Sequence, residues 1–294
     1  MARAATRWLF ALGLLGSLTL YGAQPHAASP VWAVHGARAT IYLAGSVHLL
    51  KAQDAQLPAG FERAYEDSRC VVMEIDLGRI APTQISAWLE RHGSLPAGEG
   101  LRTVLGEPRY ARLNTAAATL GAPMSTFDTQ QPWVIAVELA ELEYLRLGYD
   151  PEQGAEEQLV RRARADHKST DGLETVNDEL GGLETLSRED QLRLLDQTLE
   201  ELHDAPSDMR VVVAAWRRGD AARLSAILSK QYREFPTLYQ PLVTVRNQRW
   251  LPQIEQLLQG DRNCMVVVGA LHLVGHDGLL ELLRRDGYHP QQLN

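Results

Sequence analysis

Cys264-Met265-Val266-Val267-Val268-Gly269-Ala270-Leu271-His272 is the stretch of sequence that decides the fold. A continuous apolar run closed by a glycine is typical of a strand that is buried on both faces of a sheet. The glycine lets the chain turn sharply at the strand end and leaves space beside the backbone. The histidine then follows at the edge of the sheet where open α/β folds bind their ligands. The stretch therefore predicts a buried strand with a functional histidine at its carboxyl end.

A second copy of this arrangement stands near the start of the chain. Two strand-like pieces, 31–35 and 40–44, form a predicted hairpin that leads into Gly45-Ser46-Val47-His48. A short helix is expected over residues 61–68, and the apolar run 71–75 predicts another buried strand. The opening of the chain is therefore expected to be β-β-α-β.

The middle of the chain, from residue 85 to about residue 258, is almost wholly helical in pattern. Its breaks are expected at 96–98, 121–123, 148–154 and Pro206. The pattern then returns to a strand at 265–268, a helix at 279–285 and a last strand at 289–293.

Because both ends of the chain carry strands, we expect one α/β domain over residues 29–294. Its mixed β-sheet is built from both chain ends, and the large helical middle forms a cap or insert. Residues 1–28 have the pattern of an export signal, with Arg3 and Arg7 ahead of an apolar run that ends at Leu20. The alternative is an uncleaved N-terminal anchor.

The composition and charge of the chain limit the compartment and the classes of partner that we expect. The 294 residues are 45% hydrophobic and 22% charged, which is typical of a globular chain with a sizeable core. No stretch after the signal is apolar for the ~20 residues of a membrane span. We therefore expect a periplasmic or secreted protein without stable membrane insertion after signal cleavage. The formal charge of −8 disfavours a nucleic-acid partner, which would require a basic face.

The two cysteines, Cys70 and Cys264, each open an apolar run. In an oxidising compartment they can form a disulfide if their strands are neighbours. Two buried free thiols are the alternative, because unpaired cysteines are common in buried strands.

Glu74 is the carboxylate that joins the two histidines in our interpretation. It stands near the end of an apolar run, where burying a charge is costly without a charged or metal partner, and Asp76 shares its face at period two. His48, His272 and a carboxylate match a catalytic metal set that leaves one position open for water. Each Gly-x-x-His alone also fits a core histidine or a plain turn. The matched pair predicts one site.

The remaining histidines are weaker candidates. Three of them stand in polar contexts and are expected to be solvated: His92, His167 and His203. His276 follows His272 by four residues, but Gly275 interrupts the segment, and Asp277 is expected to cap the next helix.

Six short motifs, in order, resemble the TraB/GumN family, which includes GumN-like bacterial proteins and the Tiki proteases. They are Gly45-Ser46-Val47-His48, the strand that contains Glu74, Gly148-Tyr149-Asp150, Gly172-Leu173-Glu174-Thr175, Arg246-Asn247-Gln248-Arg249-Trp250 and the segment 267–275. The resemblance covers nearly the whole mature chain.

This resemblance implies that His48, Glu74 and His272 occupy the family's proposed metal-dependent active-site positions. It also implies that Glu174 and Arg246 are further polar positions of the same pattern.

Two points weaken the implied role of Glu174. The chain has His167-Lys168 where the family has a Gly-Lys turn, and 169–171 is a poor strand. Without the resemblance, Glu174 is a solvated loop carboxylate. Arg246 is then either a surface charge or, if it points into the site, a group that holds a substrate carboxylate or an oxyanion.

The leading hypothesis is a periplasmic, divalent-metal-dependent hydrolase of peptidase type that acts on a peptide or small-molecule substrate. In it, His48 and His272 bind Mn, Co or Zn, and Glu74 completes the metal set or activates water. One alternative is a non-catalytic GumN-like accessory protein for polysaccharide production or export. Another is a haem- or iron-binding protein, because paired histidines also suit that role.

Overall fold

A computed structural model describes residues 28–202, 205–234 and 236–294. The predicted export signal, apart from its last residue, and His203 lie outside the described residues. None of the helices within the described ranges combines the length and the apolar character that crossing a membrane requires.

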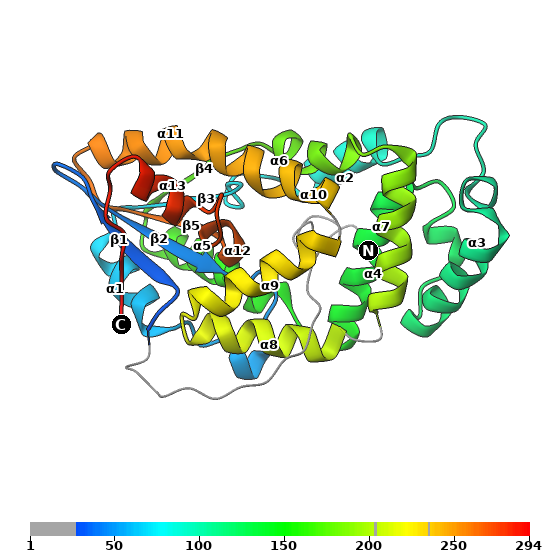
Figure 1. The fold of residues 1–294 in the computed structure, drawn as a ribbon, viewed down its shortest axis with the longest axis horizontal. Coiled ribbons are helices and arrows are strands. Elements are labelled where there is room, and N and C mark those ends of the chain that lie inside the picture. Colours follow the sequence, from blue (N-terminus) through cyan, green and yellow to red (C-terminus); the bar gives the residue numbers. More distant parts are fainter. Residues whose placement is uncertain (1–27, 203–204, 235) are drawn as a thin grey trace. The chain divides into compact units, whose positions relative to one another are not determined.

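A mixed six-stranded sheet forms the centre of the fold, in the order β4-β3-β5-β2-β1-β6 (Figure 1). Its strands are β1 Val31–His35, β2 Thr40–Ser46, β3 Cys70–Met73, β4 Ser169–Gly172, β5 Cys264–Gly269 and β6 Gln291–Gln292. The four strands β2, β5, β3 and β4 are parallel, whereas β1 runs antiparallel to both of its neighbours. The prediction of an α/β fold whose sheet is built from both chain ends is confirmed.

Three helices lie against this sheet: α1 Ala59–Asp67, α5 Ala155–Ala165 and α11 Val245–Gln259. Helix α13 Leu279–Arg285 packs on α11. Helix α1 packs on β1 and β5, and α5 packs on β3 and β4. The chain moves in one direction across the sheet through α1 and α5, and in the other direction through α11. Because parallel crossovers are right-handed, these two sets of helices cover opposite faces (Figure 1).

The helical middle divides between two compact units. One unit comprises residues 81–149 and 176–206, and the sheet unit comprises 28–80, 150–175 and 207–294. The helices of the first unit are α2 Pro82–His92, α3 Leu101–Leu120, α4 Pro132–Arg146, α6 Val176–Glu184 and α7 Arg188–Glu201. Helix α4 packs against both α3 and α7, and its buried Trp133 lies edge-on to Trp88 of α2. Segment 150–175 returns from this unit to the sheet, which the sequence pattern did not indicate.

The sheet unit contains four more α-helices, a π-helical turn and two short 3-10 turns. The helices are α8 Ala205–Arg217, α9 Ala221–Glu234, α10 Pro236–Tyr239 and α12 Ala270–Leu273. The π-helical turn η4 spans Gln240–Thr244, and the 3-10 turns are η1 Ala52–Asp54 and η3 Pro151–Gln153. A third 3-10 turn, η2 Met124–Thr126, belongs to the helical unit. The π-helical turn joins α10 to α11, so Arg246 follows directly after an irregular turn of the kind often found at functional sites.

Strand β4 corrects one expectation, because the segment judged to be a poor strand pairs with β3 from Cys70↔Ser169 to Met73↔Gly172. Its side chains are only half-buried or exposed, and an edge strand tolerates polar residues once the ladder satisfies its backbone. His167, just before it, has a φ of 54°, in the left-handed region that favours glycine. The glycine that the resemblance implies for this turn would adopt this backbone shape without strain.

Cys70 and Cys264 lie directly opposite each other on β3 and β5, with their Cα atoms 4.7 Å apart. They form a disulfide that joins positions 194 residues apart in the sequence.

Candidate functional site

His48 is placed by the turn that leaves β2. A side-chain carbon on Gly45 would lie 3.1 Å from the Cα atom of Ala270, so glycine permits the close approach of β2 to α12. A side-chain carbon on Gly154 would lie only 2.1 Å from the carbonyl oxygen of His48, so α5 starts against this turn. The first turn of α5 then brings Glu156 to His48, with Oε1 2.6 Å from Nδ1.

His272 is placed by the turn that leaves β5 and forms α12. Its ring is buried and packs on Trp250, with ring centroids 4.6 Å apart. Asn247 Oδ1 lies 2.8 Å from His272 Nδ1. The Asn247 amide nitrogen donates to the carbonyl oxygens of His272, at 3.1 Å, and Asp277, at 2.7 Å.

Glu74 is the residue directly after β3, and its side chain lies between the two histidine turns. It is 4% exposed, and its Oε1 accepts a hydrogen bond of 2.6 Å from the backbone nitrogen of Gly269. The same oxygen lies 3.9 Å from His272 Nε2. A side-chain carbon on Gly269 would lie 3.2 Å from His48 Nε2, 3.4 Å from Glu74 Oε1 and 3.7 Å from His272 Cδ2. The three predicted residues therefore gather around Gly269.

Arg246 and Glu174 complete the cluster. Arg246 is 4% exposed and donates to Glu74 Oε2 through Nη2 at 2.6 Å and to Glu174 through Nε at 2.9 Å. Its Nη1 lies 3.2 Å from His272 Nε2. Trp250 donates from its indole nitrogen to the other Glu174 oxygen at 3.1 Å. The readings of Glu174 as a solvated loop carboxylate and of Arg246 as a surface charge are therefore wrong.

The β3–β4 ladder is the physical reason that Glu174 is buried. Beyond the last paired residues of the two strands, the backbone nitrogen of Leu173 donates to the carbonyl of Met73, and that of Glu174 donates to the carbonyl of Glu74. The two glutamates therefore leave the ends of neighbouring strands side by side. One guanidinium lies between their carboxylates.

Burial and the local charges set the protonation states of the cluster. Burial alone would raise the pKa of Glu74, but the Arg246 guanidinium is the chief charge that outweighs it and lowers this pKa to about 2. Burial lowers the pKa of His272 to about 3, and burial raises the pKa of Glu174. Burial would lower the pKa of His48 too, but the Glu156 carboxylate outweighs this effect and raises it. At neutral pH the cluster contains an ionised Glu74 beside a neutral His272.

Sequence reasoning missed three polar neighbours of the histidines: Ser46, Glu156 and Asn247. Glu156 Oε1 accepts from the Ser46 hydroxyl as well as facing His48. The available signals were weak, since Glu156 is simply an acidic residue in the first turn of a helix, where such residues are common. Asn247 lies inside the Arg246–Trp250 motif that carries the family resemblance.

The other residues singled out lie elsewhere. Asp76 accepts from the backbone nitrogen of Gly78 and from Thr170, so it shapes the turn after Glu74. His276 has a side chain that is 79% exposed. His167 is exposed as expected, but His92 is half-buried, stacks on Trp88 and pairs with Glu184 at 2.9 Å.

Asp277 does not cap the following helix. Gly278, which has no side chain to cap the helix, occupies the N-cap position of α13. The Asp277 carboxylate instead accepts from the Thr244 hydroxyl at 3.2 Å, which ties the turn that carries His272 to the π-helical turn.

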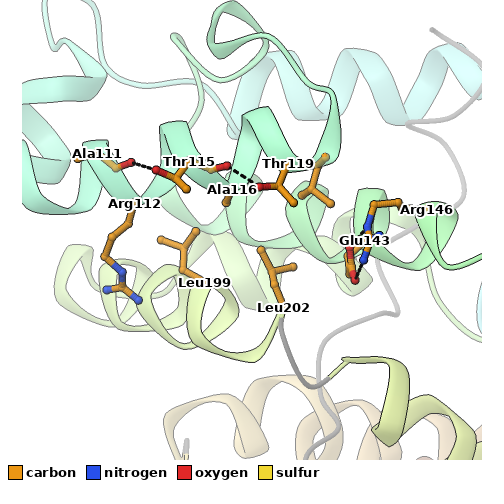
Figure 2. A pocket seen from close by; sticks show the side chains of 10 residues that line it. Ala111, Arg112, Thr115, Ala116, Thr119, Glu143, Arg146, Leu199 and Leu202 are labelled. Carbon is orange, nitrogen blue, oxygen red and sulfur yellow. Dashed lines mark hydrogen bonds and ion pairs between the residues drawn. The ribbon is translucent and has the colours of Figure 1, made fainter.

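A cavity of about 570 Å³ lies in the helical unit between α3, α4 and α7 (Figure 2). Small side chains of α3 line it together with Leu199 of α7 and Leu202 just after that helix. Arg146 and Glu143 of α4 form an ion pair of 2.6 Å on its wall. None of the residues of the histidine cluster is among its lining residues.

Comparison with known proteins identifies relatives along most of the chain. The sequence model of the TraB/PrgY/gumN family matches residues 30–292. The uncharacterized protein YbaP of Escherichia coli (strain K12) is 27% identical over 243 residues, which cover 83% of this chain and 87% of YbaP. The protein of the same description from Shigella flexneri matches to the same extent. No solved structure matches the chain.

Proposed function

Because the chain belongs to the TraB/PrgY/gumN family, we propose that its buried histidine cluster is the active site of a divalent-metal-dependent hydrolase of peptidase type. The observation that carries the proposal is the convergence of His48, Glu74 and His272 around Gly269. The export signal expected from the sequence supports a periplasmic site of action.

The donor types fit a divalent cation, and an ion would have to displace the Arg246 guanidinium from Glu74 Oε2 and His272 Nε2. Two imidazole nitrogens and one carboxylate are the three protein ligands typical of catalytic zinc sites, and Mn and Co accept the same set. Both rings have their Nδ1 atoms engaged, by Glu156 at 2.6 Å and by Asn247 at 2.8 Å. Partners of this kind orient the imidazole ligands of metal sites. His48, Glu74 and His272 would hold the ion.

The bound ion would supply a Lewis acid that polarises the scissile carbonyl and acidifies water. Arg246 supplies a fixed cation that can stabilise the negative charge developing on the substrate oxygen. Glu174 is held by Arg246 and Trp250, and its raised pKa makes it the carboxyl group best suited to take up and release a proton. Since it lies beside Glu74, both acid–base and ligand roles are available at one place.

Elemental analysis and calorimetry on the mature protein, residues 29–294, test the proposal. We expect one divalent ion per chain in the wild type and loss of that ion in His48→Ala and in His272→Ala. His276→Ala is the matched control, because this exposed histidine lies four residues beyond His272 and outside the cluster. Peptide hydrolysis should follow the metal content across the four proteins.

A wild-type protein that binds no Mn, Co or Zn would overturn the proposal, as would cluster variants that keep both metal and activity. A Soret band on adding haem, lost in the two cluster variants, would favour the haem-binding alternative instead. Full restoration of exopolysaccharide by the double histidine variant in a deletion strain would favour the accessory role.

A further inference from the structure

The tautomer of His272 is set from both sides of its ring. The Asn247 amide nitrogen faces two carbonyl oxygens, those of His272 and Asp277, so this amide has one permitted orientation. Its oxygen, which can only accept, therefore faces His272 Nδ1 at 2.8 Å. Nδ1 must carry the proton.

The contact at the other ring nitrogen, His272 Nε2, independently indicates the same tautomer. Arg246 Nη1 lies 3.2 Å from His272 Nε2, and a guanidinium can only donate. Nε2 must therefore present a lone pair to the interior of the site. A donor on one nitrogen and an acceptor on the other leave this ring a single neutral form.

The ring of His48 also has its proton held on Nδ1, but by a carboxylate. Glu156 Oε1 lies 2.6 Å from His48 Nδ1 and also accepts from the Ser46 hydroxyl. The carboxylate is buried in the first turn of α5, and that helix packs on β3 and β4. Its position is thus fixed by the sheet, and it holds the Nδ1 proton of His48 while Nε2 faces the side of Gly269.

From these contacts we infer that Glu156 and Asn247 are positioning residues that hold His48 and His272 with their protons on Nδ1, so that both Nε2 atoms present a lone pair to the site. At His272 this lone pair accepts from Arg246 Nη1, so it would bind a cation only after the guanidinium moves away. The two partners differ in charge. A carboxylate partner raises the basicity of an imidazole ligand, whereas a neutral amide only orients it. His48 is therefore the stronger of the two ligands.

The consequence for metal affinity rests on the proposed function, but the tautomer assignment does not. The test uses the mature protein labelled with ¹⁵N-histidine, free of metal, at a pH above the titration of both rings. Two-dimensional NMR then reports which nitrogen of each ring carries the proton. In the wild type we expect the Nδ1–H form for both His48 and His272.

Four variants and two controls complete the design. Asn247→Ala should release His272 from the Nδ1–H form. Asn247→Asp keeps an accepting oxygen at Nδ1 but sets its second oxygen against the carbonyls of His272 and Asp277, so it should preserve the tautomer and lower the stability. Glu156→Ala should release His48, and Glu156→Gln should restore orientation without charge. Glu157→Ala and Gln248→Ala change the next residue of each helix and should leave both tautomers unchanged.

Calorimetric titration with Zn²⁺ or Mn²⁺ measures the metal affinity of the same proteins. Loss of a partner of this kind should weaken metal affinity by about 10- to 100-fold, with Glu156→Ala the larger effect. An Nε2–H tautomer at either ring in the wild type overturns the inference. So do alanine variants that unfold at lower temperature while the tautomers stay as they were. If either alanine variant does not fold, the tautomers of the wild type and of Glu156→Gln decide the matter through the same spectra.

The two ideas fail in different ways. A wild type that binds no metal but shows both Nδ1–H forms refutes the proposed function and keeps the assignment of Glu156 and Asn247 as orienting groups. A wild type that binds metal while either ring is Nε2–H keeps the function and refutes the assignment.

Discussion

Opening the Cys70–Cys264 disulfide should strongly destabilise the protein while leaving its native contacts almost unchanged. The two cysteines are opposite each other on β3 and β5, and these strands stay paired by their backbone hydrogen bonds whether or not the sulfur atoms are joined. The effect should therefore fall mainly on the unfolded chain, which the crosslink closes into a loop.

The size of that loop gives the magnitude. With the cysteines 194 positions apart in the sequence, the chain-entropy estimate for a crosslink is about 5 kcal/mol at 25 °C, and engineered bonds often deliver less. We therefore expect reduction to lower the free energy of unfolding by about 3–5 kcal/mol. Against the roughly 5–15 kcal/mol of a typical domain, this is a large fraction of the total.

Urea unfolding of the mature protein, with and without a reducing agent, measures this difference. The slope of the transition should also rise on reduction, because an uncrosslinked unfolded chain exposes more surface. The double variant Cys70→Ala/Cys264→Ala is the control, since the reducing agent should not change its unfolding. Oxidised and reduced wild type that unfold within about 1 kcal/mol of each other would refute the reasoning, as would two titratable thiols in the denatured, unreduced protein.

Three further substitutions test other features. Gly269→Ala should keep the fold, because the φ of Gly269 is −50°. The added methyl group would lie 3.2 Å from His48 Nε2 and 3.4 Å from Glu74 Oε1, so metal affinity should fall on the order of tenfold. Unchanged affinity by calorimetry would contradict the proposed site. His167→Gly should relieve the φ of 54° and raise the free energy of unfolding by about 0.5–1 kcal/mol in urea, whereas His167→Ala should not. Burial raises the pKa of Glu141 to about 9 from 4.5, so the folded state loses stability as the pH rises from 4.5 towards 9. Glu141→Gln should therefore raise the free energy of unfolding by roughly 2 kcal/mol at pH 7 and leave it unchanged near pH 4. An equal gain at both pH values in thermal unfolding would exclude this cause.

The parts of the fold that the sequence predicted are those buried on both faces. Strand β5 and the run that opens at Cys70 consist almost entirely of apolar residues, because no side chain of a central parallel strand reaches water. The glycine that opens each histidine motif could be interpreted too, since it marks a strand end where another backbone comes close. Together these signals placed His48 and His272 at the same edge of one sheet.

The parts that the sequence did not predict depend on partners far away in the chain. Strand β4 has polar side chains, and only its pairing with β3 makes it a strand. Glu156 and Asn247 come from helices whose local pattern says nothing of the ring that each one contacts. The division of the helical middle between two units is likewise a result of packing, because residues 150–175 have no composition that sets them apart from their neighbours.

The position of β5 has a consequence for how the protein is made. This strand lies between β2 and β3, yet it leaves the ribosome or the export channel nearly two hundred residues after β3. Until then, β2 and β3 have unpaired edges that face each other, and such edges favour wrong pairing and aggregation. Cys70 has no partner thiol during the same interval, and one histidine of the cluster has not yet been synthesised. The β1–β2 and β3–β4 pairs can form before β5 is available, but they are joined into one sheet, crosslinked and supplied with His272 only when β5 and the turn after it arrive.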